Sequence, residues 1–169
     1  SMTRNADRTG KTGQRIFFGT ILLGVSLLAV GCGGKTPDDL GAKGATLGGC
    51  PSSPNCVSSA ADDEGHAIAA LAIDGPQEAA WAALREVVSG GERVSVETDS
   101  EGYLYAVYTS KLMGYNDDVE FLANSASRQI EVRSASRVGY GDGGVNRDRI
   151  EAVRSALVSR GVVRSGSDD

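Results

Sequence analysis

The sequence is poor in the residues that most often perform chemistry. It contains one histidine, His66, and three cysteines among 169 residues. One histidine excludes a metal site built on two histidines, and three cysteines exclude a four-cysteine zinc site. No serine stands in a Gly-x-Ser-x-Gly turn, so a hydrolase nucleophile of that kind is also absent. His66 lies outside the charged segments of the chain, and we expect it to be a surface or strand-edge residue.

Positive charge is scarce as well. The chain has 17 Lys and Arg against 22 Asp and Glu, a formal net charge of −5. Four of the basic residues but only one of the acidic residues precede Cys32, so the chain from Cys32 onward carries a net charge of −8. This balance excludes a nucleic-acid partner and excludes attachment to anionic lipid through charge.

Long hydrophobic runs are limited to one, IFFGTILLGVSLLAVG, which ends at Gly31. Its sixteen residues fall short of the roughly 20 that a spanning helix needs, and Arg4, Arg8, Lys11 and Arg15 precede it. A basic start followed by a short apolar run is typical of a secretory signal. Residues 28–32, LAVGC, resemble the bacterial lipobox. We therefore expect a lipoprotein signal peptide over residues 1–31 and lipidation of Cys32; an uncleaved membrane helix with an incidental cysteine is the alternative.

A lipid on Cys32 would anchor the chain to a membrane of the bacterial cell envelope, facing the periplasm or the outside. Gly33 and Gly34 stand where an aspartate commonly retains lipoproteins in the inner membrane, so the outer membrane is favoured. Residues 32–49 are rich in glycine and show no apolar period, which predicts a flexible tether. The folded domain is expected over residues 50–161, followed by a loose tail over 162–169.

The two remaining cysteines, Cys50 and Cys56, are separated by five residues that include Pro51 and Pro54. A close pair in an oxidising compartment predicts a structural disulfide. No histidine adjoins the pair for haem attachment, and a catalytic redox pair is normally spaced by two residues. The disulfide is therefore preferred.

Apolar residues recur at helical spacing in two segments. Trp81, Leu84 and Val88 form the stripe of a helix that follows Gly75-Pro76 and stops at Gly90-Gly91. A second stripe, Ile150, Val153 and Leu157, predicts a helix from Asn146, as its N-cap, to Gly161.

Strand patterns separate these helices. Residues 66–73 predict a short strand, and residues 92–100, 102–110, 116–123 and 128–136 alternate with a period of two at hairpin spacing. The order predicts an α+β domain, an antiparallel sheet of about four to five strands with two helices packed on one face.

The segment RSASRVGYGDGGVNRDRI, residues 133–150, combines four arginines with four glycines. If the strands over residues 116–123 and 128–136 are neighbours, the alternation of their side chains predicts a cross-strand ion pair between Glu120 and Arg133. Asp117 is expected on the same face of its strand as the apolar Val119 and Phe121. A carboxylate buried there needs a cation to compensate its charge, and Arg137 and Arg147 are the candidates. The acidic residues Asp117, Asp118, Glu120 and Asp142 are as many as the arginines of this segment. Equal numbers of opposite charges favour an ion-pair network that stabilises the fold, and an anion pocket is the alternative. The candidate charged cluster comprises Asp117, Asp118, Glu120, Arg133, Arg137, Asp142, Asn146, Arg147 and Arg149.

Two further interpretations are weaker. The spacing G-x-G-x-x-G at Gly139, Gly141 and Gly144 is that of a dinucleotide site, but too few residues follow the last helix to form the required returning strand, and no cofactor is expected. An enzyme would use Asp117, Asp118 or Glu120 as acid or base, with Arg133 and Arg137 holding an anionic substrate. A divalent cation bound by Asp117, Asp118 and Asp142 would compete with the arginines. A non-catalytic module that binds an envelope protein or an anionic ligand is preferred.

Three motifs, CPSSPNCVSS, DDVEF and RSASRVGYGDGGVNR, closely resemble those of the domain-of-unknown-function (DUF) family 1499. The resemblance spans about residues 50–158, and Gly143 stands where many members carry a larger residue. It implies a membrane-associated bacterial setting, with relatives in plant plastids, and it implies no established activity.

Overall fold

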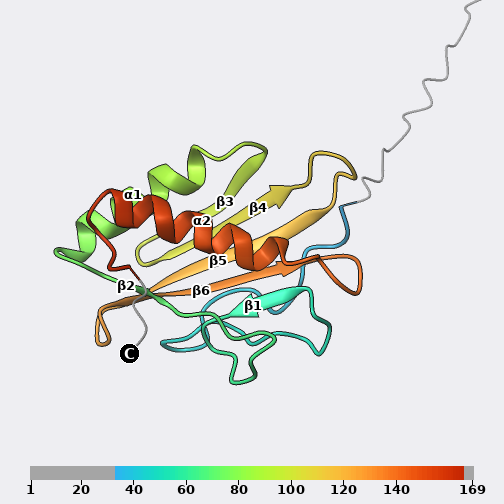
Figure 1. Cartoon of the computed structure of the whole chain (residues 1–169), viewed down its shortest axis with the longest axis horizontal. Helices are drawn as coiled ribbons and strands as arrows, with labels where there is room; N and C mark the ends of the chain where they lie inside the picture. The colour runs from blue at the N-terminus through green and yellow to red at the C-terminus, as the bar shows by residue number, and fades with distance from the viewer. Residues whose placement is uncertain (1–32, 166–169) are drawn as a thin grey trace, which may run out of the picture. The chain divides into compact units, whose positions relative to one another are not determined.

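The computed structural model describes residues 33–165, so the predictions for the signal peptide, for Cys32 and for the last four residues lie outside the described range. Within that range no helix is both long enough and apolar enough to cross a membrane. The elements in chain order (Figure 1) are β1 (Cys56–Ser58), β2 (Leu71–Ala72), α1 (Gln77–Ser89), β3 (Val94–Ser100), β4 (Tyr103–Thr109), β5 (Asn116–Asn124), β6 (Gln129–Ser136) and α2 (Val145–Ser159).

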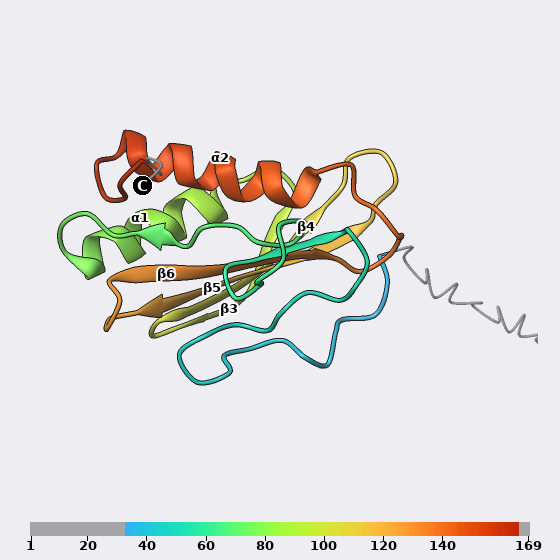
Figure 2. The same cartoon turned by 60° about the horizontal axis from the view of Figure 1, so that its bottom comes forward.

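The strands form one antiparallel sheet in the order β1-β6-β5-β4-β3, and β2 also pairs with β6. Both helices cover the same face of the sheet (Figure 2). The predicted α+β class with two helices on one face is confirmed. The described part has six strands, one more than the upper predicted number. The additional strand is the three-residue β1, which shows no strand pattern in the sequence, and β2 is much shorter than the predicted 66–73.

The hydrophobic core fills the space between the helices and the sheet. Alternation turns Val119 and Phe121 of β5 toward the helices, where both are fully buried. The predicted stripes supply the other half of the core, including Leu84 of α1 and Ile150 of α2. Burying one side chain of this size contributes roughly 1.5–3 kcal/mol, so this layer is the main source of stability.

Residues 33–49 run across the other face of the sheet, opposite the helices (Figure 2). Leu47 is buried there, Ser58 donates a hydrogen bond to the carbonyl oxygen of Gly48 at 3.0 Å, and the backbone N–H of Gly41 donates to Glu120 at 2.6 Å. The structure differs here from the flexible tether that composition predicts. We call residues 33–49 the N-terminal segment.

The start of the predicted loose tail is also attached to the domain. Val163 is buried and forms a bridge with Ile73, and the backbone N–H of Arg164 donates to the carbonyl oxygen of Ala72 at 2.9 Å. The fold therefore extends beyond the predicted boundary at residue 161.

The Cys50–Cys56 disulfide is confirmed, with 5.6 Å between the two Cα atoms. It joins Cys50, the residue directly after the N-terminal segment, to Cys56, the first residue of β1. Closing a loop this small stabilises a domain by about 2 kcal/mol in the loop-entropy model. The bridge fixes the chain at the point where it leaves the sheet face and enters the sheet.

Candidate functional site

The predicted charged residues divide between the two faces of the sheet. Period-two alternation sends Asp118 and Glu120 to the face opposite the helices, while Asp117 points toward the helices. The first group joins two tyrosines and two arginines, and we call it the open-face cluster. Its members are Tyr103 and Tyr105 of β4, Asp118 and Glu120 of β5, Arg133 of β6 and Arg137 directly after β6.

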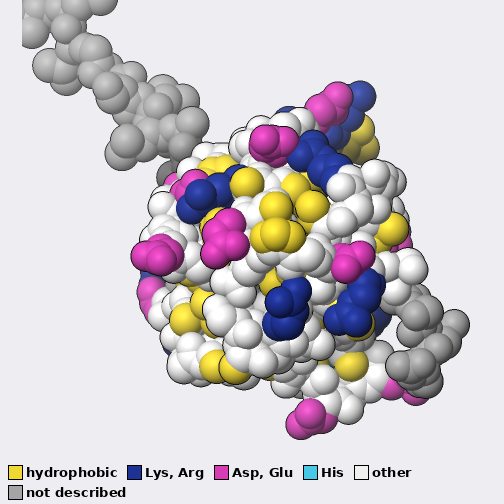
Figure 3. Space-filling model, turned by 90° about the vertical axis from the view of Figure 1, so that its left-hand side faces the viewer, with side chains coloured by type: hydrophobic (Ala, Val, Ile, Leu, Met, Phe, Trp, Pro, Cys, Tyr) yellow, Lys and Arg dark blue, Asp and Glu magenta, His cyan; other side chains and the backbone are white. Residues whose placement is uncertain are grey.

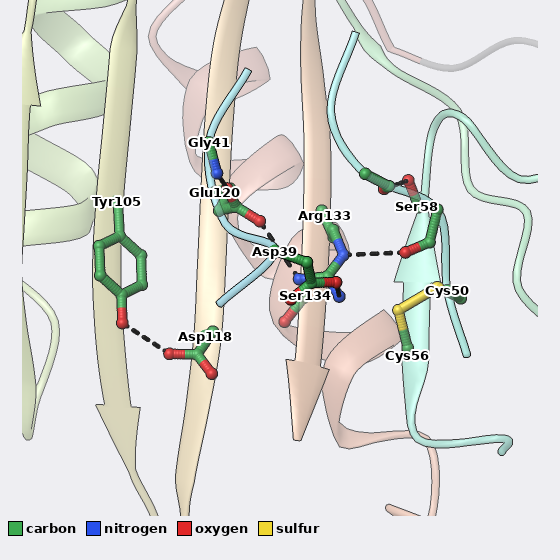
Figure 4. Close-up of polar contacts among 12 residues, drawn as sticks. Asp39, Gly41, Cys50, Cys56, Ser58, Tyr105, Asp118, Glu120, Arg133 and Ser134 are labelled. Atoms are coloured by element: carbon green, nitrogen blue, oxygen red, sulfur yellow. Dashed lines mark hydrogen bonds and ion pairs between the residues drawn. A yellow bond between two sulfur atoms is a disulfide. The ribbon is translucent and has the colours of Figure 1, made fainter. Parts of the chain in front are cut away.

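The predicted cross-strand pair Glu120–Arg133 is present in the open-face cluster. The two residues are direct partners in the β5–β6 register, and Nη1 of Arg133 lies 3.2 Å from Oε2 of Glu120. Tyr103 donates its hydroxyl hydrogen to Oε1 of Glu120 at 2.8 Å, and Nε of Arg133 donates to the carbonyl oxygen of Gly49 at 3.1 Å. Figure 4 shows the two side chains pointing toward each other. Glu120 is 1% exposed and Arg133 3% exposed, so the pair is shielded from water.

The second ion pair of the open-face cluster joins Asp118 to Arg137. Nη2 and Nε of Arg137 donate to the Asp118 carboxylate at 2.8 Å and at 3.0–3.1 Å, and the Tyr105 hydroxyl donates to the same carboxylate at 2.7 Å. The hydrogen bond to Asp118 raises the pKa of Arg137. Burial and then the hydrogen bond to Asp118 raise the pKa of Tyr105 well above its ordinary 10.0, so the phenol stays protonated and acts as a donor.

The N-terminal segment closes over the open-face cluster. Asp39 lies 3.6 Å from Nη2 of Arg133, Gly41 donates to Glu120, and Nη1 of Arg137 donates to the carbonyl oxygen of Gly34 at 3.4 Å. Figure 4 shows Asp39 and Gly41 in front of the strands that carry Glu120 and Arg133. Much of this cover is made by backbone groups, which leave no trace in side-chain patterns.

Asp117 belongs to a separate group on the helix side of the sheet. Its Oδ2 accepts a hydrogen bond from Nη2 of Arg149 at 2.6 Å. Nη1 of Arg149 also donates to Ser134 at 3.0 Å and to Oδ1 of Asn146 at 2.7 Å, and the guanidinium lies 4.8 Å from the centre of the Tyr108 ring. We call these five residues the helix-face cluster.

The prediction that Arg137 or Arg147 compensates Asp117 is wrong. Arg137 follows β6 on the open face and meets Asp118 instead. Arg147 donates a hydrogen bond to the carbonyl oxygen of Gly65 at 3.3 Å instead. Arg149 is three residues beyond the buried Asn146, so one helical turn places it on the sheet-facing side of α2.

The start of α2 also differs from the prediction. The helix begins at Val145 with Gly144 as its N-cap, and Asn146 is inside the first turn with a fully buried side chain. Asp142 caps the turn by accepting hydrogen bonds from the backbone N–H groups of Gly144 and Asn146 at 2.9 and 3.0 Å. Burial raises the pKa of Asp142, but the hydrogen bonds that its carboxylate accepts lower the pKa by more. The pKa of Asp142 therefore lies below its ordinary 3.8.

Removing this cap should have a modest, pH-dependent effect. We expect Asp142→Ala to lower the free energy of unfolding by about 1 kcal/mol at pH 7, because two backbone donors lose their acceptor. A depressed folded-state pKa stabilises the fold above the unfolded pKa and loses that contribution as the pH falls through the folded value. The difference between wild type and variant in urea unfolding should therefore shrink at pH 3. Asp142→Asn, which keeps an acceptor oxygen, is the matched control; an equal difference at both pH values contradicts the assignment.

The structure brings together neither a metal site nor a histidine site in the charged region. Among residues 33–165 no group of three or more His, Cys, Asp and Glu is placed to hold a metal ion. Asp117 and Asp118 point to opposite faces, which removes the cation site considered for them with Asp142. His66 lies in a loop, where Nδ1 is 2.7 Å from Asp63. That hydrogen bond raises the pKa of His66, and the imidazole stays apart from both clusters.

Two cavities bear on the question of a ligand. One, of about 480 Å³, lies between the N-terminal segment and the sheet, and its charged lining includes Lys35, Asp118, Arg133 and Arg137. The larger one, of about 650 Å³, lies beside β2 and β6, is lined by Ile68 and Arg154 among others, and contains no member of either cluster. We give the smaller cavity more weight, because it opens onto the charged residues.

The arrangement determines what the charged residues can do. Each of the three carboxylates in the two clusters is buried and held by a guanidinium, and the tyrosines donate to two of them. The buried Glu131 of β6 lies outside the clusters and accepts a hydrogen bond from Ser59 at 2.7 Å. A paired, buried carboxylate is a poor proton acceptor, and a paired guanidinium has little charge left for a substrate. The tyrosines and Ser134 were missed from the sequence, although the alternation of Tyr103 and Tyr105 with Leu104 and Ala106 placed both tyrosines on one face.

The fold and the two clusters define a two-layer α+β domain with buried ion pairs on both faces of its sheet. The chain belongs to the family described as protein of unknown function (DUF1499), whose sequence model matches residues 46–157. The matched range contains all six strands, nearly all of α2 and every member of both clusters, whereas residues 33–45 of the N-terminal segment precede it. The chain matches no curated protein and no solved structure.

Proposed function

We propose that this chain is a lipid-anchored protein of the bacterial cell envelope, and that its DUF1499 domain is a non-catalytic binding or structural module. The observation that carries the second half is that each buried carboxylate of the two clusters, Asp117, Asp118 and Glu120, is paired with an arginine. A general acid or base must exchange its proton with a substrate. Asp118 is fully buried and Glu120 nearly so, and both are already bound on several sides.

The anchoring half is supported by the sequence before Gly33 and by the disulfide. Gly31-Cys32 after a short apolar run fits lipoprotein processing, and Gly33-Gly34 favours the outer membrane. The Cys50–Cys56 bridge suits an oxidising compartment outside the cytoplasm. The partners that fit this setting are the membrane, through the lipid, and an envelope protein or an anionic ligand.

Metabolic labelling tests the anchor. Expressed in a bacterium with intact lipoprotein processing, the chain should incorporate labelled palmitate, and Cys32→Ser should abolish the label and leave the precursor uncleaved. The matched control replaces both Cys50 and Cys56 by serine, which leaves Cys32 as the sole cysteine and should keep the label. Equal labelling of Cys32→Ser, or cleavage of that variant at the same site, would remove the basis for lipidation.

A second function has one observation in its favour. The cavity of about 480 Å³ beside the open-face cluster is lined by Lys35, Arg133 and Arg137, and guanidinium groups bind carboxylate and phosphate groups well. An envelope enzyme acting on an anionic substrate would use this cavity, with Asp118 as its acid or base. That function requires the arginines to exchange their present partners for the substrate, and it predicts that millimolar phosphate raises the melting temperature of the wild type.

A further inference from the structure

The large exposed hydrophobic side chains of residues 33–165 are concentrated in two connections. Six such side chains are exposed, and all except Val96 lie in the β4–β5 loop or in the connection from β6 into α2, counted here to the first helical residue, Val145. Leu112 is 90% exposed and Tyr140 is 79% exposed, values that leave almost no contact with the domain. We call these five residues the loop patch: Leu112, Met113, Tyr115, Tyr140 and Val145.

The two connections are neighbours in space. Tyr115 from the first and Val145 from the second line the same hollow of about 270 Å³, together with Val138 and Gly139. Figures 1 and 2 both place the two connections at one end of the sheet, where β4 and β6 finish. The two connections that carry the loop patch therefore lie side by side at that end of the sheet.

The N-terminal segment starts at the same end. Gly33 is packed so closely against Asn116, the first residue of β5, that a side chain at position 33 would collide with it. A side chain at position 34 would collide with Arg137 and Val138, which lead into the second connection. Gly33, the residue that follows Cys32 in the sequence, therefore lies at the end of the domain that carries the loop patch.

The loop patch has the chemistry of a membrane-contacting surface. Leucine, methionine and valine lose unfavourable contact with water in the acyl region, and tyrosine prefers the interface between headgroups and acyl chains. Lys111, next to Leu112, can keep its charge at headgroup level while its stem lies along the apolar side chains. At the opposite end of the domain, hydrophobic, acidic and basic side chains are interspersed (Figure 3).

A membrane also fits the shape of the loop patch better than a protein partner does. The most exposed side chains sit at the tips of loops and not in a groove, whereas a stable protein interface buries about 800 Å² on each partner, some 20–30 residues. Five side chains on two tips do not supply such an area, but a bilayer accepts protruding apolar groups without a complementary shape.

We propose that the loop patch inserts into the surface of the membrane to which the chain is attached, and so holds this end of the sheet against the bilayer. The inference rests on the proposed attachment at Cys32. The uncleaved membrane helix considered above would also attach the chain through residues that precede Gly33, so the proposed orientation does not depend on which of the two attachments operates.

Fluorescence quenching by brominated lipid tests this orientation. The full chain, expressed with intact lipoprotein processing, is reconstituted into phosphatidylethanolamine–phosphatidylglycerol vesicles whose acyl chains carry bromine. Leu112→Trp should be quenched several-fold more than the wild type, whose sole tryptophan, Trp81, is buried in α1. Tyr140→Trp provides a second reporter in the other connection. The matched control is Ala126→Trp, in the exposed β5–β6 turn at the opposite end, which should stay unquenched.

Palmitate labelling and vesicle flotation of the same samples separate the two proposals. Chain that floats while Leu112→Trp and Tyr140→Trp are quenched no more than Ala126→Trp overturns the orientation and leaves the attachment standing. Chain that floats without palmitate but shows quenching at both reporters supports the orientation and overturns lipidation. Chain that neither floats nor carries palmitate overturns both. Labelled chain with both reporters quenched supports both.

Discussion

Replacing Arg133 by alanine is expected to lower the free energy of unfolding by about 3–5 kcal/mol, because it leaves Glu120 buried without its cation. Domains of this size have total stabilities of about 5–15 kcal/mol, so the variant should be close to unfolding at 37 °C. The N-terminal segment should loosen as well, since Arg133 also holds the carbonyl oxygen of Gly49. Urea unfolding followed by circular dichroism measures the change.

The matched control is another arginine–glutamate pair. Arg160 and Glu86 approach to 2.7 Å, closer than Arg133 and Glu120, but both side chains are largely exposed. Exposed pairs contribute roughly 0–1 kcal/mol, so Arg160→Ala should change little. Combining Arg133→Met with Glu120→Leu should cost less than the sum of the single changes, because no unpaired charge remains.

An anion pocket predicts a different set of results. If Arg133 served mainly to bind a ligand, its removal would leave stability unchanged, and millimolar phosphate would raise the melting temperature of the wild type. Finding Arg133→Ala as stable as the wild type, together with stabilisation by phosphate, would overturn the structural role and support the second candidate function. A destabilised variant and a wild type indifferent to phosphate would support the first.

The sequence was sufficient for strands β3 to β6 and for every charged member of the two clusters, but not for β1, for the tyrosines or for Ser134. Period-two alternation depends only on backbone geometry, so it located β3 to β6 and correctly opposed Glu120 to Arg133 across β5 and β6. The short turns between these strands then predicted their order in the sheet, because consecutive antiparallel strands joined by a short turn pair with each other. The same reasoning separated Asp117 from Asp118 by face.

Two features depended on information that local patterns do not carry. The rotation of α2 about its own axis decides whether Arg147 or Arg149 meets Asp117, and the charged residues at the start of this helix do not define that rotation to within one turn. The N-terminal segment adheres largely through backbone groups, such as the N–H of Gly41 and the carbonyl oxygens of Gly34, Gly48 and Gly49. Every residue has a backbone carbonyl group and almost every residue a backbone N–H group. A glycine-rich composition therefore does not indicate which of these groups form hydrogen bonds with the domain.

The helix-face cluster gives the second large effect. Arg149→Ala should lower the free energy of unfolding by about 3 kcal/mol or more, because it removes the guanidinium that pairs with the buried Asp117 and two further hydrogen bonds, to Ser134 and Asn146. Arg147→Ala is the matched control, since it changes the same residue type two positions away on the same helix. Its one hydrogen bond to a carbonyl oxygen predicts a change within about 0.5 kcal/mol.

A double-mutant cycle identifies the partner of Asp117 directly. Asp117→Ala and Arg149→Ala should be strongly non-additive, because each removes the same ion pair. Asp117→Ala and Arg137→Ala should add, because Arg137 binds Asp118 on the opposite face of the sheet. Urea unfolding of the single and double variants gives both coupling energies. Coupling of Asp117 to Arg147 in place of Arg149 would show that α2 is rotated on the sheet relative to this structure. Coupling to Arg137 would contradict the assignment of Asp117 and Asp118 to opposite faces of the sheet.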